Sequence, residues 1–197
     1  MREVELKSVV PELASARAAV EKAGGKLTFE GRLIDLRYGD TSGEMVANDH
    51  VLRLRVYEHA GKSEGHLDWK GPTRYDGGYK VREELSTSAG DPESLKQILA
   101  NLGYVVIREI ERVIAQYSIH GAVVRFEEYP RMDLLVEVEG SPEAIEQVIE
   151  SIGLPRTGFT SARLPEFVAH FEARTGQRAA LSARELAGEY SYPPDDA

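Results

Sequence analysis

Charged and apolar residues alternate at a spacing of two in several short segments of the chain. In residues 3–7 (Glu-Val-Glu-Leu-Lys), this spacing puts two carboxylates and an ammonium on one face of an extended strand and two apolar side chains on the other. Residues 135–139 (Leu-Val-Glu-Val-Glu) repeat the pattern. The apolar faces can pack beneath helices, whereas the charged faces need a wet interior. Two distant strands that each offer paired carboxylates indicate a divalent-metal site between them.

The hydrophobic pattern predicts an α+β protein. Period-two alternation and turn signals predict strands at residues 2–9, 32–38, 51–58, 64–70, 79–87, 104–117, 121–128 and 133–140. Helical spacing and capping signals predict helices at residues 11–23, 91–103, 141–153 and 164–174. We expect residues 1–180 to form a single domain and residues 181–197 to form a partly flexible C-terminal tail.

The charged faces of these strands carry both signs, and two architectures accommodate them. One is an antiparallel sheet with a solvated face and helices on its other side. The other is a closed eight-stranded antiparallel β-barrel with a polar lumen and helices packed outside. Buried charges are costly unless they pair or bind ions. The mixed charges favour the barrel, in which carboxylates hold hard cations and Arg and Lys hold an anion.

Composition narrows the functional classes. The chain has 197 residues, of which 42% are hydrophobic, and a formal net charge of -9, which argues against a nucleic-acid partner. It has no cysteine, and its five histidines lack metal-ligand spacing. No signal peptide is visible, and no apolar run approaches the ~20 residues of a membrane span. We therefore expect a cytoplasmic protein with no membrane partner.

Several segments within roughly residues 1–155 match, in order, the motifs of one known family. Residues 3–7 match the signature E-x-E-x-K, and Glu127 matches an acidic residue that precedes the final motif. The other matches are 49–55 (D-x-x-L-R-x-R), 69–72 (resembling Y-K-G-P), 81–84 (x-R-E-E), 99–103 (L-x-x-L-G) and 135–139 (resembling F-V-E-x-E). In this ordered set the chain resembles the CYTH superfamily, the triphosphate tunnel metalloenzymes. The resemblance implies the barrel fold and a small-molecule triphosphate as substrate.

The resemblance also implies roles for individual residues. Residues expected to hold Mg2+ or Mn2+ are Glu3, Glu5, Glu84, Glu127, Glu137 and Glu139. Residues expected to bind triphosphate are Lys7, Arg53, Arg55, Lys70, Arg82, Arg112 and Arg125. Residues expected to act in catalysis are Lys7, Arg55, Lys70 and Glu127. For each of them, the alternative is an ion pair in the lumen without substrate contact.

The same phosphate-binding residues serve two reactions in this family. The motifs at residues 69–72 and 81–84 resemble the class IV adenylyl cyclase branch, which predicts conversion of ATP to cyclic AMP and pyrophosphate. Residues 37–46 depart from that branch, which leaves hydrolysis of tripolyphosphate, thiamine triphosphate or a nucleoside triphosphate as the alternative. A sensor that binds polyphosphate without turnover is a third interpretation. The apolar outer wall is also compatible with a homodimer.

Overall fold

The structure, a computed structural model, describes residues 2–40 and 42–190, except for the side chains of Arg2, Glu3 and Lys80. Its strands are β1 (Arg2–Val9), β2 (Lys26–Gly39), β3 (Val51–His59), β4 (Lys62–Lys70), β5 (Arg74–Asp76), β6 (Tyr79–Ala89), β7 (Val105–Ile119), β8 (Ala122–Glu128) and β9 (Leu135–Glu139). Its helices are α1 (Leu13–Lys22), α2 (Glu44–Ala47), α3 (Pro92–Asn101), α4 (Pro142–Ile152), α5 (Leu164–Thr175) and α6 (Ala183–Leu186), with a 3-10 turn at Arg156–Gly158.

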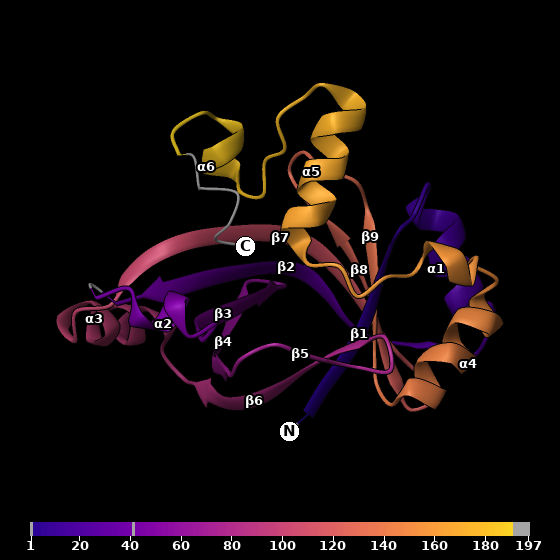
Figure 1. The fold of residues 1–197 in the computed structure, drawn as a ribbon, viewed down its shortest axis with the longest axis horizontal. Helices are drawn as coiled ribbons and strands as arrows, with labels where there is room; N and C mark the ends of the chain where they lie inside the picture. The colour runs from indigo at the N-terminus through magenta and orange to yellow at the C-terminus, as the bar shows by residue number, and fades with distance from the viewer. Residues whose placement is uncertain (1, 41, 191–197) are drawn as a thin grey trace.

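Eight of these strands close into an antiparallel barrel. Hydrogen bonding follows the order β1-β9-β8-β7-β2-β3-β4-β6, and pairing of β6 with β1 completes the ring. The short β5 pairs with β6 alone. Figure 1 shows α1 and α4 at one end of the barrel, α2 and α3 at the other, and α5 and α6 above it. The predicted closed barrel is therefore confirmed, and the open sheet with one solvated face is wrong.

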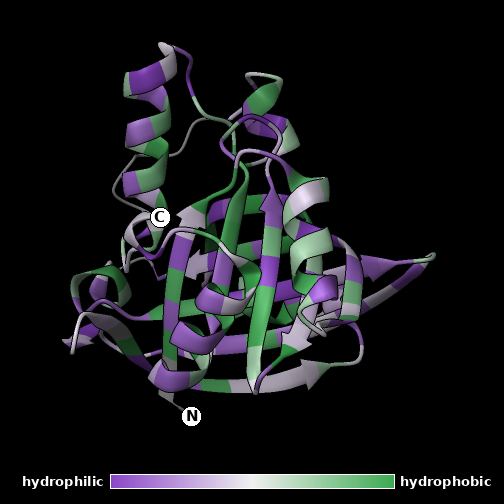
Figure 2. Ribbon diagram, turned by 90° about the vertical axis from the view of Figure 1, so that its right-hand side faces the viewer, coloured by the Kyte–Doolittle hydropathy of each residue, from purple (hydrophilic) through white to green (hydrophobic). Residues whose placement is uncertain are grey.

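The hydrophobic core lies outside the barrel wall. The apolar faces of β1, β7, β8 and β9 pack beneath α1 and α4, and a smaller cluster joins α3 to β2 and β3. Leu6, Val136 and Val138 belong to the larger cluster and are at most 1% exposed. Figure 2 shows hydrophobic and hydrophilic residues alternating along several strands. Because adjacent residues of a strand face opposite ways, this core directs the charged residues between them into the barrel.

Local capping sets the ends of the main helices. The Glu12 carboxylate accepts hydrogen bonds from the backbone N–H groups of Ala14 and Ser15 at the start of α1, at 2.8 and 2.7 Å. Asp91 and Ser141 cap α3 and α4 in the same way, and each cap is followed by proline at the first helical position. The predicted helices at 11–23, 91–103, 141–153 and 164–174 are therefore found close to their expected bounds.

The longest strands extend further than the alternation predicts. β2 begins at Lys26 rather than at residue 32 and pairs with β7 along nearly its whole length, with an irregularity between Leu27 and Phe29. On its other edge, β2 requires Gly31 beside the end of β3, because a Cβ there would lie 2.3 Å from the carbonyl oxygen of Glu58. The irregularity shifts the side chains relative to the simple alternation, which explains why the pattern missed this segment.

The start of the predicted C-terminal tail packs on the barrel. Leu181 is 1% exposed, and its carbonyl accepts a hydrogen bond of 2.7 Å from the backbone N–H of Glu111 on β7. Ala180 pairs with Arg131, and α6 follows directly. The tail's partial flexibility stays a prediction, and residues 191–197 lie outside the described residues.

Within 2–40 and 42–190, none of the helices has the length and apolarity to cross a membrane.

Candidate functional site

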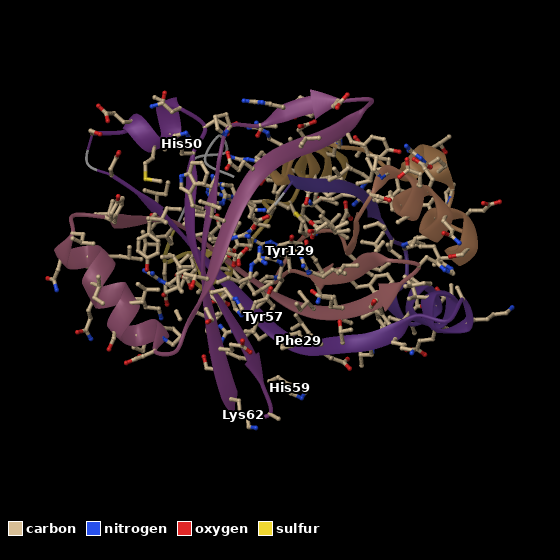
Figure 3. All side chains as sticks on the ribbon, turned by 90° about the horizontal axis from the view of Figure 1, so that it is seen from below. Phe29, His50, Tyr57, His59, Lys62 and Tyr129 are labelled. Carbon is tan, nitrogen blue, oxygen red and sulfur yellow. The ribbon has the colours of Figure 1, made fainter. Side chains whose placement is uncertain are left out.

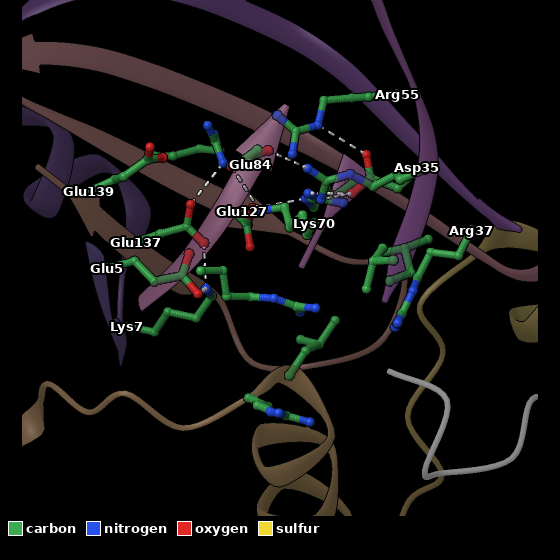
Figure 4. Close-up of a pocket in the computed structure, with 18 of the residues that line it drawn as sticks. Glu5, Lys7, Asp35, Arg37, Arg55, Lys70, Glu84, Glu127, Glu137 and Glu139 are labelled. Carbon is green, nitrogen blue, oxygen red and sulfur yellow. Dashed lines mark hydrogen bonds and ion pairs between the residues drawn. The ribbon is translucent and has the colours of Figure 1, made fainter. Parts of the chain in front are cut away.

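A cavity of about 710 Å³ occupies the inside of the barrel. Among the described residues, nine cationic and seven acidic side chains line it, from every strand of the ring and from the start of α5. The cationic residues are Lys7, Arg37, Arg53, Arg55, Lys70, Arg82, Arg112, Arg125 and Arg163. The acidic residues are Glu5, Asp35, Asp49, Glu84, Glu127, Glu137 and Glu139. Figure 4 shows many of these side chains converging.

The wall formed by β1, β8 and β9 carries a carboxylate pair bridged by a lysine. The Lys7 ammonium lies 2.5 Å from Glu137 Oε2 and 3.0 Å from Glu5 Oε1, and Arg125 Nη1 lies 2.8 Å from Glu137 Oε1 (Figure 4). Burial alone would raise the pKa of the Glu137 carboxyl, but the charges of Lys7 and Arg125 hold that pKa well below its usual range. Glu137 is therefore ionised at neutral pH.

On the opposite wall, three arginines surround one buried aspartate. Asp35 of β2 is 3% exposed. Its Oδ2 lies 3.0 Å from Arg112 Nη2 and 3.4 Å from Arg53 Nη1, and its Oδ1 lies 3.4 Å from Arg55 Nε. Burial would raise the pKa of Asp35, but the charges of Arg112 and Arg55 lower it. Asp68 of β4 holds Arg53 from the other side, at 2.9 Å. The two aspartates fix the arginines as a group.

Glu127 lies on β8 beside the arginine group, and both of its oxygens have partners. Arg112 Nε donates to Oε1 at 2.9 Å, and the Tyr129 hydroxyl donates to Oε2 at 2.6 Å. Burial, followed by the nearby Glu127 charge, raises the pKa of Tyr129 well above its ordinary value, which keeps the phenol protonated. Figure 3 shows Tyr129 in the interior of the molecule. The Glu127 carboxylate thus links the arginine group to the carboxylate wall.

Asp49 ties together the segments around one mouth of the cavity. Its Oδ2 accepts from the backbone N–H of Thr73 at 2.6 Å and from Arg163 Nη2 at 3.5 Å. Arg82 donates to the carbonyl oxygens of Asp49 and Gly71, at 2.6 Å each. The loop before β3, the loop after β4 and the start of α5 are therefore held together at this mouth.

The structure brings together the sequence-predicted site residues whose side chains it describes. All seven predicted triphosphate ligands line the cavity, as do Glu5, Glu84, Glu127, Glu137 and Glu139. Lys70 Nζ lies 3.3 Å from Glu84 Oε2. The side chain of Glu3 lies outside the described residues, and the individual roles of all these residues stay predictions.

Sequence reasoning missed several residues of the cavity. Asp35 is the most deeply placed of them, within the apolar segment of residues 33–36. A single acidic residue inside an apolar strand is a signal that could have identified it. Tyr57, whose hydroxyl accepts a hydrogen bond of 3.0 Å from Arg55, and Tyr129 gave no such signal because aromatic residues are common in strands.

The carboxylates fit a hard divalent cation by their chemistry and by their position on adjoining strands. Glu5 pairs with Glu139 and Lys7 with Glu137 in the register of β1 and β9, and oxygen donors of this kind suit Mg2+ and Mn2+. Within the described residues, no group of three or more acidic or histidine side chains is already arranged around a metal position. Of the residues predicted to hold the cation, Glu5, Glu137 and Glu139 lie on these adjoining strands, and Lys7 lies between Glu5 and Glu137.

Comparisons with known proteins relate the chain to solved structures. Neither a family model nor a curated protein sequence matches it. The PH1819 protein of Pyrococcus horikoshii is similar with a TM-score of 0.70 and 21% identity over 85% of this chain and 98% of that one. A candidate adenylate cyclase from Vibrio parahaemolyticus gives a TM-score of 0.71 and 18% identity, covering 85% and 97%.

A third solved structure extends the similarity further along the chain. HpAC1 from Hippeastrum, a candidate adenylyl cyclase with a dominant triphosphatase activity, gives a TM-score of 0.63 and 18% identity over 92% of this chain and 98% of its own. The chain therefore shares the fold of these structures, which is the barrel that its resemblance to the CYTH superfamily predicted.

Proposed function

We propose that this chain is an enzyme of the CYTH superfamily that processes triphosphates with the help of Mg2+ or Mn2+. The observation that carries the proposal is the convergence of a carboxylate wall and an arginine wall inside one cavity. A triphosphate carries roughly four negative charges near neutral pH. The cationic excess in the lumen, nine side chains against seven, does not balance that charge alone. A divalent cation on the carboxylates supplies more positive charge.

The residues that line the cavity have two roles: they bind the phosphate groups, and they stabilise the negative charge that develops during the reaction. Arg53, Arg55 and Arg112 offer guanidinium groups whose planar geometry suits phosphate oxygens, and Lys70 adds a flexible cation. When bound, the metal adds electrophilic stabilisation of negative charge on the phosphate oxygens. Because Asp35 and Asp68 hold the arginines before substrate arrives, little reorganisation is needed when charge develops at phosphorus.

Two reactions follow from this arrangement, and each has support. Attack of a ribose 3′-hydroxyl on the α-phosphorus of ATP gives cyclic AMP and pyrophosphate. An organic substrate is favoured by the apolar and aromatic part of the cavity lining, at Tyr38, Val46, Ile107 and Leu164. Attack of water on the terminal phosphorus gives hydrolysis instead. Hydrolysis is supported by the triphosphatase activity of the similarly folded Hippeastrum protein. The cytoplasmic location and the homodimer stay predictions.

A product assay separates these reactions from each other and from a sensor. The protein is incubated with ATP and with tripolyphosphate in the presence of Mg2+ or Mn2+, and the products are identified by mass spectrometry. Cyclic AMP with pyrophosphate indicates the cyclase, and phosphate release indicates the triphosphatase. Absence of turnover for these and for thiamine triphosphate would contradict an enzymatic function and favour the sensor.

We expect Arg55→Ala to slow turnover by at least ~10-fold, because charge-assisted hydrogen bonds contribute about 1.5–3 kcal/mol. Arg55→Lys should restore only part of the rate, because an ammonium cannot make a bidentate phosphate contact. The matched control is Arg74→Ala, at an exposed position on β5. Steady-state kinetics of the three variants test this expectation, and equal rates for Arg55→Ala and wild type would remove Arg55 from the site.

A further inference from the structure

The Lys7 ammonium lies where a cation shared by Glu5 and Glu137 would lie. It is 3.0 Å from the first carboxylate and 2.5 Å from the second, and the lysine side chain is 12% exposed. Glu5 and Lys7 share one face of β1, and Glu137 is opposite Lys7 on β9. Figure 4 shows the lysine reaching toward both carboxylates. A divalent cation and this ammonium cannot occupy the same position between the two carboxylates.

Other predicted metal ligands are also held by cations. Glu127 contacts Arg112, and Glu84 lies 3.3 Å from Lys70 and 3.7 Å from Arg53. The lumen is therefore a network of ion pairs in which acidic groups balance cationic ones. A metal entering this network alone meets the repulsion of Lys7, and a triphosphate entering alone meets the repulsion of the carboxylates.

We propose that Lys7 makes metal binding and triphosphate binding depend on each other. When both ligands enter, the lysine leaves Glu5 and Glu137 for a phosphate oxygen, and the carboxylates take the metal. The four-carbon stem and single rotatable ammonium suit this movement better than a planar guanidinium does. Each ligand thereby removes the repulsion that opposes the other, which is a positive coupling between two sites. This inference rests on the proposed function, and it adds a coupling between the two ligands of that site.

The test measures Mn2+ binding without any triphosphate. Metal-free protein is titrated with Mn2+, and the free ion is followed by electron paramagnetic resonance. Lys7→Met keeps the length of the side chain and removes its charge. We expect it to bind Mn2+ at least ~10-fold more tightly than wild type, because the competing ammonium is gone. Adding Glu137→Gln to Lys7→Met should abolish the gain.

Two further variants serve as a control and as a substitute for Lys7→Met. Lys62→Met is the matched control, since Lys62 is exposed at the outer end of the β3–β4 hairpin (Figure 3), and it should bind Mn2+ as wild type does. Lys7→Gln is the second variant if Lys7→Met fails to fold, as judged by thermal melting. An affinity of the folded Lys7 variant equal to or below that of wild type would overturn the inference.

The same variants distinguish this inference from the proposed function. Tripolyphosphate binding in the presence of a chelator should weaken in Lys7→Met, because the phosphate loses one cation. If wild type turns over a triphosphate with Mn2+ but the Lys7 variants gain no metal affinity, only the coupling is wrong. If the wild-type protein neither binds Mn2+ beside tripolyphosphate nor turns over a triphosphate, the proposed function itself fails.

Discussion

Glu137→Gln should reduce metal-dependent turnover by at least ~100-fold. Glu137 contacts both Lys7 and Arg125, and its pKa is held well below the usual range, so that the wild-type group is a full anion. The amide keeps the size of the side chain but removes the charge that would bind the metal. It also leaves two cations with one partner fewer, so the cavity becomes more positive while the divalent ion loses a ligand.

The matched control for this substitution is Glu150→Gln, at an exposed position on α4. Initial rates at several Mg2+ and Mn2+ concentrations are compared for the two variants and wild type. We expect Glu150→Gln to match wild type at every concentration and Glu137→Gln to stay slow even at high metal. Wild-type rates in Glu137→Gln would show that the carboxylate wall does not take part in turnover.

Asp35→Asn should have the largest effect on stability. Asp35 contacts Arg53, Arg55 and Arg112 at 3.0 to 3.4 Å, and losing one partner of a buried ion network costs about 3 kcal/mol. For a chain of this size, that corresponds to a decrease in melting temperature of roughly 6–12 °C. Tripolyphosphate should stabilise Asp35→Asn more than wild type, because the ligand supplies the negative charge that the arginines have lost.

The effect of Asp35→Asn should also depend on pH. The pKa of Asp35 is lowered in the folded protein from an ordinary value of 3.8. A carboxyl group with a lowered folded pKa stabilises the fold above its unfolded pKa, and this contribution is lost as the pH falls through the folded pKa. The stability difference between wild type and Asp35→Asn should therefore be constant above about pH 5 and shrink below about pH 4.

Urea unfolding across this pH range measures the difference, with Glu150→Gln as the control at an exposed position on α4. The control should unfold as wild type does at each pH. A stability of Asp35→Asn equal to wild type at pH 7 would mean that the arginines do not need this carboxylate. A larger stabilisation of wild type than of the variant by tripolyphosphate would contradict the proposed replacement of charge.

The alternation of charged and apolar residues predicts most strands of the barrel, because adjacent residues of a strand face opposite sides of the sheet. In residues 4–7 and 136–139, the apolar positions pack under α1 and α4, and the charged positions between them line the cavity. The alternation alone is also compatible with an open sheet. It separates the two faces of a sheet but does not determine whether the sheet closes into a barrel. Closure depends on the pairing of β1 with β6, which is a contact between distant segments.

The sequence could not predict contacts between side chains that come from distant strands and meet only in the closed barrel. The three arginines that contact Asp35 come from β3 and β7, which are other strands of the barrel. The contact between Leu181 and Glu111 joins the C-terminal segment to a strand about 70 residues earlier, and no local pattern marks it. Lys7 was predicted to bind phosphate, but its place between two carboxylates follows only from the register of β1 and β9.

We propose that one cavity inside the barrel binds a triphosphate on its arginine wall and a divalent cation on its carboxylate wall. A crystal structure with Mn2+ and a non-hydrolysable triphosphate analogue would locate both ligands. We predict phosphate density beside Arg53, Arg55 and Arg112, with an anomalous manganese peak beside Glu5 and Glu137. Ligand density confined to the outer surface, with the ion pairs of Lys7 and Asp35 unchanged, would contradict it.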